Sequence, residues 1–158
     1  MSKRFTAHST FIIERELPGR PAYAFRFWSE PDMKKRWAAC HADWQTIDYA
    51  FDFRVGGSEV NRLRTPEGVI HGFRSYYLDI IAGSRIIYAY EMSADEARIS
   101  ASLTTVEFVP SGDRTRMIFT EQVVFLDGRA DAQTRQEGTE MGFSRLASEL
   151  ERDIKPGS

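Results

Sequence analysis

The sequence predicts an α+β fold in which a strongly curved antiparallel sheet surrounds one long C-terminal helix. Three observations lead to this class. Residues 45–125 alternate between strand-like runs and short turns, an apolar stripe with helical spacing follows them, and two short aromatic segments precede them. Because these turns are much shorter than a parallel crossover, neighbouring strands are expected to be antiparallel.

The first elements are one strand and two short helices. Residues 8–16 read as a strand that ends at Pro18-Gly19, and residues 22–29 read as a helix that begins after a proline. A second proline separates this helix from another over residues 32–37. Helices this short are marginal alone, so their aromatic faces are expected to be buried against the sheet, with Trp28 closing one end of a cavity.

Six more strands are expected, over residues 46–55, 58–64, 69–81, 84–93, 98–109 and 114–125. Gly56-Gly57 is expected to supply the positive-φ backbone of a tight connection. In residues 69–81 the apolar positions change from odd to even numbers, which a regular strand does not allow. We therefore expect a bulge or sharp bend near Arg74-Ser75.

The C-terminal segment reads as an amphipathic helix. Its apolar stripe consists of Phe143, Leu146, Ala147, Leu150 and Ile154. Gly138 and Gly142 each cost about 1 kcal/mol relative to alanine inside a helix. Close approach to the sheet, room for a ligand and a locally weak helix all explain these glycines, and the sequence leaves the choice open.

Composition restricts the classes of function. The 158 residues are expected to form a single domain over residues 1–158, and the net charge of −2 gives no basic surface for nucleic acid. No apolar run is long enough to span a membrane and no secretory signal is visible, so we expect a cytoplasmic protein that binds neither nucleic acid nor membranes. Aromatic residues make up 13% of the chain, which suits a pocket for apolar ligands as well as a core.

Motifs for metals, cofactors and nucleophiles are lacking. His8, His41 and His71 are far apart in the sequence, and Cys40 is the single cysteine, so we expect no metal and no disulfide. Cys40 lies next to His41, but adjacent side chains point apart, so a free thiol is favoured over a catalytic dyad. No phosphate-binding loop appears, and we expect no cofactor.

One carboxylate is expected inside the sheet. Glu121 shares a strand face with Met117 and Phe119, and if these point inward then Glu121 does too. Burial of a carboxylate is costly unless it is paired. Glu121 is therefore an acid, a base or a ligand anchor, or else it is paired with an arginine or lies in water at the mouth of the sheet.

The sequence also resembles a known family. The segments Ala24-Phe25-Arg26-Phe27-Trp28, Met33-Lys34-Lys35-Arg36-Trp37 and Asp52-Phe53-Arg54-Val55-Gly56-Gly57 resemble bacterial homologues of the heat-shock-protein ATPase activator. That family belongs to the START-like (SRPBCC) superfamily. Gly142-Phe143 is similar to the Gly-Trp of the family's last helix, with Phe in place of Trp.

The resemblance implies a helix-grip fold, with a seven-stranded antiparallel sheet around the C-terminal helix and a cavity between them. Relatives bind lipids, sterols, hormones or polyketides, and a minority are enzymes. The namesake stimulates a chaperone ATPase largely through a separate N-terminal domain, to which nothing in this sequence corresponds. The resemblance therefore does not imply chaperone activation here.

Three functions remain open. The first is binding of a small apolar or aromatic ligand in the cavity, and the second is a hydrolase, cyclase or dehydratase that uses Glu121 or His71 as acid or base. The third is a partner-binding co-chaperone or stress-response module. An exposed strand edge such as residues 58–64 would suit a homodimer. The expected ligand-binding residues are Trp28, Phe53, His71, Phe73, Tyr88, Tyr90, Thr104, Phe119, Glu121, Thr139 and Phe143.

Overall fold

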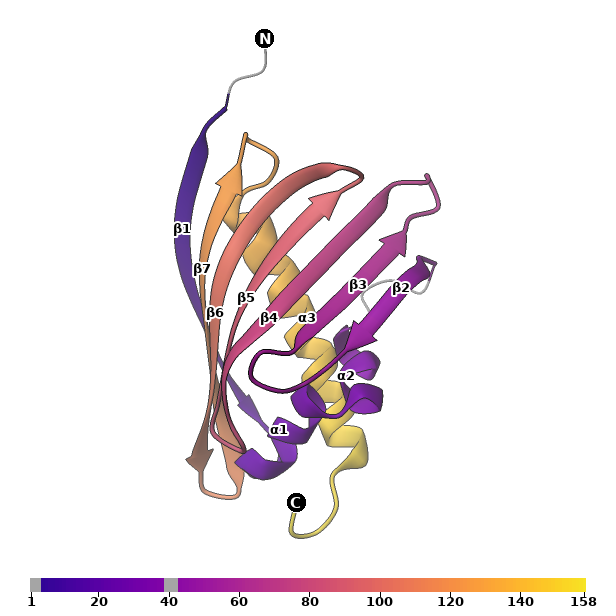
Figure 1. Ribbon diagram of the computed structural model, residues 1–158. Helices are drawn as coiled ribbons and strands as arrows, with labels where there is room; N and C mark the ends of the chain where they lie inside the picture. Colours follow the sequence, from indigo (N-terminus) through magenta and orange to yellow (C-terminus); the bar gives the residue numbers. More distant parts are fainter. Residues whose placement is uncertain (1–3, 39–42) are drawn as a thin grey trace.

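A computed structural model of the protein describes residues 4–38 and 43–158 (Figure 1). The elements are β1 (Thr6–Leu17), α1 (Pro21–Ser29), α2 (Pro31–Ala38), β2 (Gln45–Phe51), β3 (Ser58–Arg64), β4 (Ile70–Ile81), β5 (Arg85–Ala94), β6 (Ala97–Ser111), β7 (Arg114–Leu126) and α3 (Ala132–Asp153). All seven strands form one antiparallel sheet. The helix-grip fold expected from the sequence is confirmed.

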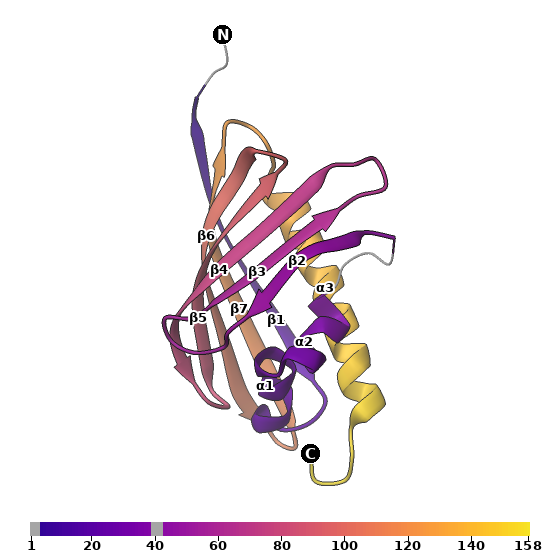
Figure 2. The same cartoon turned by 45° about the vertical axis from the view of Figure 1, so that its right-hand side comes forward.

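The sheet curves around α3, and the two short helices lie beside the C-terminal half of α3 (Figures 1 and 2). The strand order is β1-β7-β6-β5-β4-β3-β2, so β1 and β2 form the two edges. The strand over residues 58–64 is β3, which pairs with β2 on one side and β4 on the other. The prediction that this strand offers a free edge for a homodimer is therefore wrong.

The short helices are fixed by aromatic contacts. Pro21 occupies the first helical position, where its missing N–H leaves no bond unmade. The rings of Trp28 and Trp37 lie 4.7 Å apart, and Trp37 Nε1 donates a hydrogen bond of 2.8 Å to the Phe27 carbonyl. α2 is thereby held on α1, while the packing on the sheet that we expected is made by Trp28, whose ring lies 6.2 Å from that of Phe108 in β6.

The tightest packing lies where α1, α2 and the C-terminal half of α3 meet β6 and β7. Phe27, Met117, Leu146 and Leu150 have no exposed surface there. The other buried apolar residues of this cluster are Phe11, Ile13, Leu17, Tyr23, Ala24, Phe25, Trp28, Trp37, Tyr77, Ile86, Val106, Phe108, Phe119, Val123, Phe125 and Phe143. The protein's own side chains fill this region, and the cluster continues along β7 to Val123 and Phe125.

The irregularity predicted in β4 exists, but at a different place. Pairing with β5 shifts register between Tyr77 and Asp79, so the bulged residue is Leu78 and not Arg74-Ser75. Tyr76 and Leu78 are 45% and 53% exposed on the outer face. Odd-numbered residues face inward as far as Tyr77, whereas Tyr76 and Leu78 are exposed outer residues, and beyond the bulge Ile80 packs against the core.

The Gly-Gly connection uses its two glycines differently. β2 ends at Phe51, four residues before the predicted end at residue 55, and a loop leads to β3. Gly56 has φ +85°, whereas a Cβ on Gly57 would lie 2.2 Å from the Asp52 carbonyl oxygen. Gly57 is thus required for close backbone approach. The loop also bonds to β4, because Gly56 N–H donates to the Tyr77 carbonyl and Tyr77 N–H to that of Gly57.

α3 begins at a side-chain cap and contains two glycines, Gly138 in open surroundings and Gly142 on the buried side of the helix. Asp131 accepts a hydrogen bond of 2.8 Å from the Thr134 N–H at the helix start. A Cβ on Gly138 would meet nothing within 4 Å, and one on Gly142 would meet Arg145 at an ordinary 3.6 Å. Neither glycine is held against the sheet, so close approach does not explain them.

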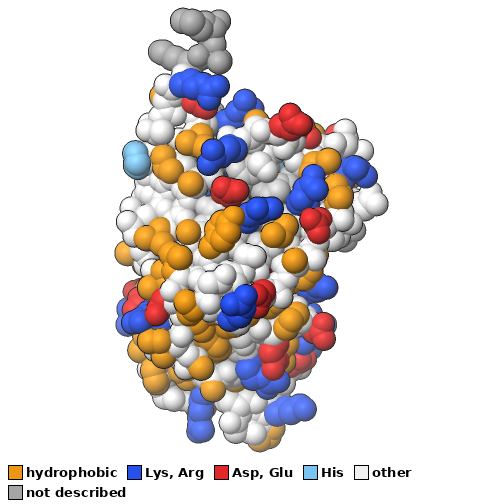
Figure 3. Space-filling view, viewed as in Figure 1, with side chains coloured by type: hydrophobic (Ala, Val, Ile, Leu, Met, Phe, Trp, Pro, Cys, Tyr) orange, Lys and Arg blue, Asp and Glu red, His pale blue; other side chains and the backbone are white. Residues whose placement is uncertain are grey.

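The outer face of the sheet exposes a group of apolar side chains. Tyr76, Ala89 and Leu103 are aligned across β4, β5 and β6. Leu103 is 39% exposed and Ile12, on the edge strand β1, is 58% exposed. Hydrophobic side chains gather over the strands in the space-filling view, with charged groups between them (Figure 3).

Candidate functional site

Polar side chains occupy two neighbouring rungs on the inner face of the sheet. Cross-strand pairing aligns Tyr77, Tyr88, Thr104 and Glu121 in one rung, across β4 to β7. The next rung aligns Glu59, Ser75, Tyr90 and Ser102, across β3 to β6. We call these eight residues the polar band. Such a band is unusual on a buried sheet face, because each polar group there needs a partner.

Glu121 is buried and paired. It is 1% exposed, and its Oε2 accepts hydrogen bonds from Tyr90 Oη at 2.6 Å, Ser102 Oγ at 3.0 Å and Arg135 Nη1 at 3.2 Å. Arg135 Nη1 also donates to Tyr90 Oη at 2.9 Å, and Nη2 donates to Ser100 Oγ at 2.7 Å. The sequence left several environments open for Glu121. In the structure its side chain points inward and is paired with an arginine.

Arg135 reaches this site from the first turns of α3. Its guanidinium lies 5.2 Å from the Phe125 ring centroid and 5.8 Å from that of Tyr90, so aromatic faces as well as Glu121 hold it. Thr139, which was expected to contact a ligand, donates its hydroxyl to the Arg135 carbonyl at 2.9 Å. Thr139 thus bonds to the helix backbone.

The two tyrosines of β5 stay protonated at neutral pH. Burial raises the pKa of Tyr90, and the neighbouring Glu121 carboxylate raises it further. Burial likewise raises the pKa of Tyr88 well above its ordinary value. Tyr88 keeps some accessible surface despite its inner position, whereas Thr104 beside it has none. Thr104 Oγ1 has no hydrogen-bond partner among the described residues.

A second buried ion pair lies at the other end of the polar band. Lys34 Nζ of α2 is 3.0 Å from Glu59 Oε1, and both side chains are nearly inaccessible, at 11% and 7%. Tyr77 Oη donates to the same carboxylate oxygen at 3.3 Å. The Lys34 ammonium also faces the rings of Trp28, Trp37 and Phe51, at 5.4, 5.8 and 5.5 Å.

Aromatic rings run between these two ends. Centroid distances are 4.9 Å for Phe53–Tyr77, 6.0 Å for Tyr77–Tyr88, 6.0 Å for Tyr88–Tyr90 and 5.0 Å for Phe73–Tyr90. We call these five residues the aromatic row. Phe53, Phe73 and Tyr88 are only partly buried, unlike the rings around α1 and α2. The row is therefore a less densely covered part of the inner face.

Three of the expected ligand-binding residues belong to the packed core instead. Trp28 is 6.1 Å from Phe143, and Phe119 is 4.9 Å from Phe143. All three are at most 3% exposed. They support the end of the sheet that α1 and α2 close. The expected residues that the structure does bring together are Phe53, Phe73, Tyr88, Tyr90, Thr104 and Glu121.

His71 does not join this group. It stacks on Trp44 at 4.8 Å and precedes Tyr77 by six residues along β4. Six residues of extended strand span about 20 Å. Because Tyr77 lies in the same rung as Glu121, His71 and Glu121 cannot act together on one small substrate.

Four residues of the site escaped the sequence reasoning: Lys34, Glu59, Tyr77 and Arg135. Arg135 left a signal, because it precedes Thr139 by four residues and Phe143 by eight, the spacing of one helix face. Glu59 left none, since its strand alternates without a clear apolar face. Lys34 lies in a helix too short to show which side is buried.

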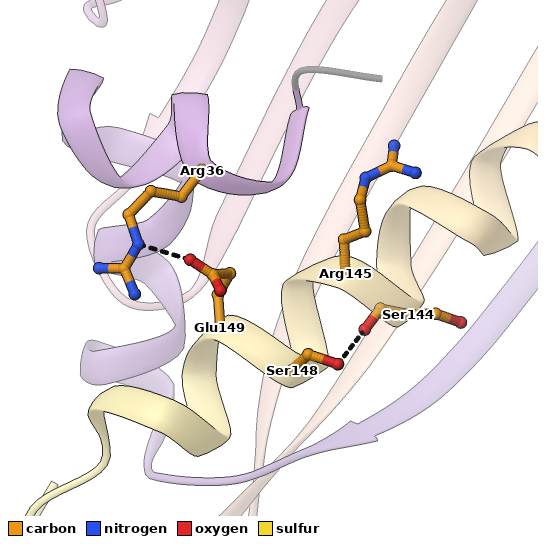
Figure 4. Close-up of a pocket in the computed structure, with 5 residues that line it drawn as sticks. All are labelled: Arg36, Ser144, Arg145, Ser148 and Glu149. Atoms are coloured by element: carbon orange, nitrogen blue, oxygen red, sulfur yellow. Dashed lines mark hydrogen bonds and ion pairs between the residues drawn. The ribbon is translucent and has the colours of Figure 1, made fainter. Parts of the chain in front are cut away.

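A shallow surface pocket of about 310 Å³ lies between α2 and α3, lined by Arg36, Ser144, Arg145, Ser148 and Glu149 (Figure 4). Arg36 bonds to Glu149 at 2.7 Å and to Asp153 at 2.6 Å, while Arg145 donates to the Trp37 carbonyl at 3.0 Å. The Arg36 bonds lower the pKa of the Asp153 carboxyl. This pocket is a place where α2 is attached to α3, outside the inner face.

Within residues 4–38 and 43–158, no three His, Cys, Asp or Glu side chains gather as metal ligands would. No helix in those ranges has both the length and the apolar character needed to cross a bilayer. Cys40 and His41 lie outside the described residues.

The sheet, the enclosed helix and the inner band define a START-like helix-grip protein. The chain belongs to the family described as activator of Hsp90 ATPase homolog 1-like protein, whose profile matches residues 20–154. It is 50% identical to an uncharacterised protein of Rhizobium leguminosarum (TM-score 0.91; 96% of this chain and 100% of that one covered).

A protein of Rhizobium loti is 40% identical (TM-score 0.87; 92% and 99% covered). An AHSA1-like protein of Aeromonas hydrophila shares the fold at 19% identity (TM-score 0.68; 91% and 93% covered). Comparison with curated proteins gives no match.

Proposed function

We propose that this protein binds a small, largely apolar or aromatic ligand between the inner face of the sheet and α3. The observation that carries the proposal is the aromatic row. Phe73 of β4 and Tyr88 of β5 lie on the enclosed side of the sheet yet keep accessible surface, as does Phe53, which packs on Phe25 of α1 at 5.8 Å. The rings of Phe27, Trp28 and Phe143, in contrast, are at most 3% exposed. Partly covered aromatic rings beside a few fixed polar groups are typical of small-molecule sites.

The binding energy would come mainly from apolar burial. Removing about 250 Å² of apolar ligand surface from water contributes about 6 kcal/mol before the cost of association, at about 25 cal/mol per Å². The Tyr88 and Tyr90 hydroxyls and the Glu121 carboxylate would then orient the ligand through directed hydrogen bonds. Glu121 is 1% exposed and Thr104 is fully buried, so a ligand would reach either of these two groups only after a local rearrangement.

The geometry favours binding over acid–base catalysis. Glu121 already accepts three hydrogen bonds, one of them from an arginine, so its side chain is held in one position. His71 lies too far along β4 to serve as its partner. A binding protein needs no proton transfer, and a carboxylate held in one position can still accept a hydrogen bond from a ligand.

Fluorescence titration with the uncharged probe N-phenyl-1-naphthylamine tests the proposal. We expect enhancement with the wild type and its loss in Tyr88→Ala, which removes the centre of the aromatic row. The control is Tyr76→Ala on the outer face, where the side chain is 45% exposed. The proposal fails if the probe does not bind, or if both variants lose binding equally.

Self-association through the outer face is a second candidate function. Tyr76, Ala89 and Leu103 form an apolar rung there, and an ion pair of Asp79 with Arg85, at 2.6 Å, joins the same two strands, β4 and β5. A patch of this kind can pair with itself about a two-fold axis. Sedimentation equilibrium should show a dimer that Leu103→Lys disrupts, and a wild-type monomer at all concentrations would exclude it.

A further inference from the structure

The charges on the inner face of β3 to β7 are balanced in pairs. Glu59 and Glu121 are the two acidic side chains of the polar band, and each is paired with a cation from a helix: Lys34 of α2 and Arg135 of α3. All four side chains are at most 11% exposed. The remaining members of the band carry hydroxyl groups only. The surface that a ligand would meet therefore has buried charges but no net charge.

From this balance we infer the class of ligand, an inference that rests on the proposed function. The site selects an uncharged aromatic molecule that carries a hydroxyl group, over the carboxylate or the amine built on the same rings. Arg135 is the residue that determines this specificity, because it compensates Glu121 and leaves no free charge for an ionic ligand. A third ion placed there would be desolvated without a partner of its own.

The hydrogen bonds of Glu121 indicate why a hydroxyl group is favoured. All three bonds to this carboxylate go to Oε2, and Oε1 accepts none from the described residues. Because Glu121 is 1% exposed, a ligand reaches Oε1 only after a local rearrangement, and an O–H group can then donate to it without changing the charge of the site. A ligand carboxylate cannot donate and would repel Glu121, while an ammonium group would face the Arg135 guanidinium.

The sheet also limits the size of the ligand. Glu59 on β3 and Glu121 on β7 are separated by four strand intervals. Four intervals of about 4.8 Å amount to about 19 Å, of which the ion pairs occupy the two ends. The aromatic row, with Phe73 and Tyr77 on β4 and Tyr88 and Tyr90 on β5, lies between these ends, so a ligand held there would be no longer than two or three fused rings.

Calorimetric titration of the wild type at pH 7 with four matched probes tests the inference: 2-naphthol, 2-naphthoate, 2-naphthylmethylammonium and naphthalene. We expect 2-naphthol to bind at least about tenfold more tightly than either ion, and more tightly than naphthalene, which lacks the donor. Equal or tighter binding of 2-naphthoate would overturn the selectivity but would still support the proposed binding function. If none of the four binds, the proposed function itself fails.

A variant separates charge balance from shape. Glu121→Gln keeps the size of the side chain but leaves Arg135 uncompensated, so the preference should shift by at least about tenfold from 2-naphthol towards 2-naphthoate. Glu14→Gln, which breaks an exposed ion pair with Arg116, is the matched control and should leave the ratio unchanged. If folded Glu121→Gln keeps the wild-type ratio of affinities for 2-naphthol and 2-naphthoate, Arg135 does not have the proposed role. If this variant does not fold, the ratio measured with the wild type alone tests the inference.

Discussion

Replacement of Arg135 by methionine tests how the inner band is held together. The substitution keeps an apolar side chain of useful length but leaves Glu121, which is 1% exposed, without its cation. It also removes the bonds to Tyr90 at 2.9 Å and Ser100 at 2.7 Å. Breaking a buried pair in this way costs about 3 to 5 kcal/mol. That is a large part of the stability of an ordinary domain.

Urea unfolding monitored by circular dichroism measures this loss. Arg135→Met combined with Glu121→Gln should be less destabilised than Arg135→Met alone, because the amide carries no charge while its carbonyl still accepts from Tyr90. The control is Arg116→Met, which breaks the Glu14 pair with side chains 52% and 50% exposed and should cost under about 1 kcal/mol. The reasoning is refuted if Arg135→Met also costs under about 1 kcal/mol, or if the double variant is no better than the single one.

Three further predictions concern stability measured by urea unfolding. Thr104→Val should raise the free energy of unfolding by about 1 kcal/mol, because it removes a buried hydroxyl that lacks a partner; a decrease would mean that the hydroxyl is bonded. Gly57→Ala should destabilise because of its 2.2 Å clash with the Asp52 carbonyl, whereas Gly138→Ala in open space should stabilise by about 1 kcal/mol; the same sign for both would contradict the glycine assignments. Burial raises the pKa of several tyrosines above their unfolded value of about 10, so their stabilising contribution is complete below pH 10 and is lost as pH rises further. These tyrosines are Tyr23, Tyr49, Tyr77, Tyr88 and Tyr90. Above about pH 10 the unfolded fraction and the tyrosinate absorbance should rise together. Two separate transitions would argue against buried phenols.

The order and type of the elements were predictable because each left a local signal. Prolines mark both ends of α1, and strand periodicity with short turns gives the antiparallel order. The position of the β4 bulge was not predictable. Apolar Tyr76 and Leu78 lie on the exposed face, and a sequence alone does not distinguish an exposed tyrosine from a buried one.

The candidate site was predictable only in part. Strand alternation was enough to place Glu121 on the inner face with Phe119 and Met117. Its partner was missed because the distance between Glu121 and Arg135 depends on how α3 crosses the sheet. Cross-strand alignment of Tyr77, Tyr88 and Thr104 likewise depends on register, which local periodicity does not fix.

Chemical-shift and NOE measurements on protein labelled at its tyrosine rings test whether a ligand binds to the inner face of the sheet. With 2-naphthol added, we expect intermolecular NOEs to the Tyr88 and Tyr90 rings, and none to Tyr76 on the outer face. Ligand NOEs confined to Tyr76, or inner tyrosine signals that do not change at saturating ligand, would contradict it.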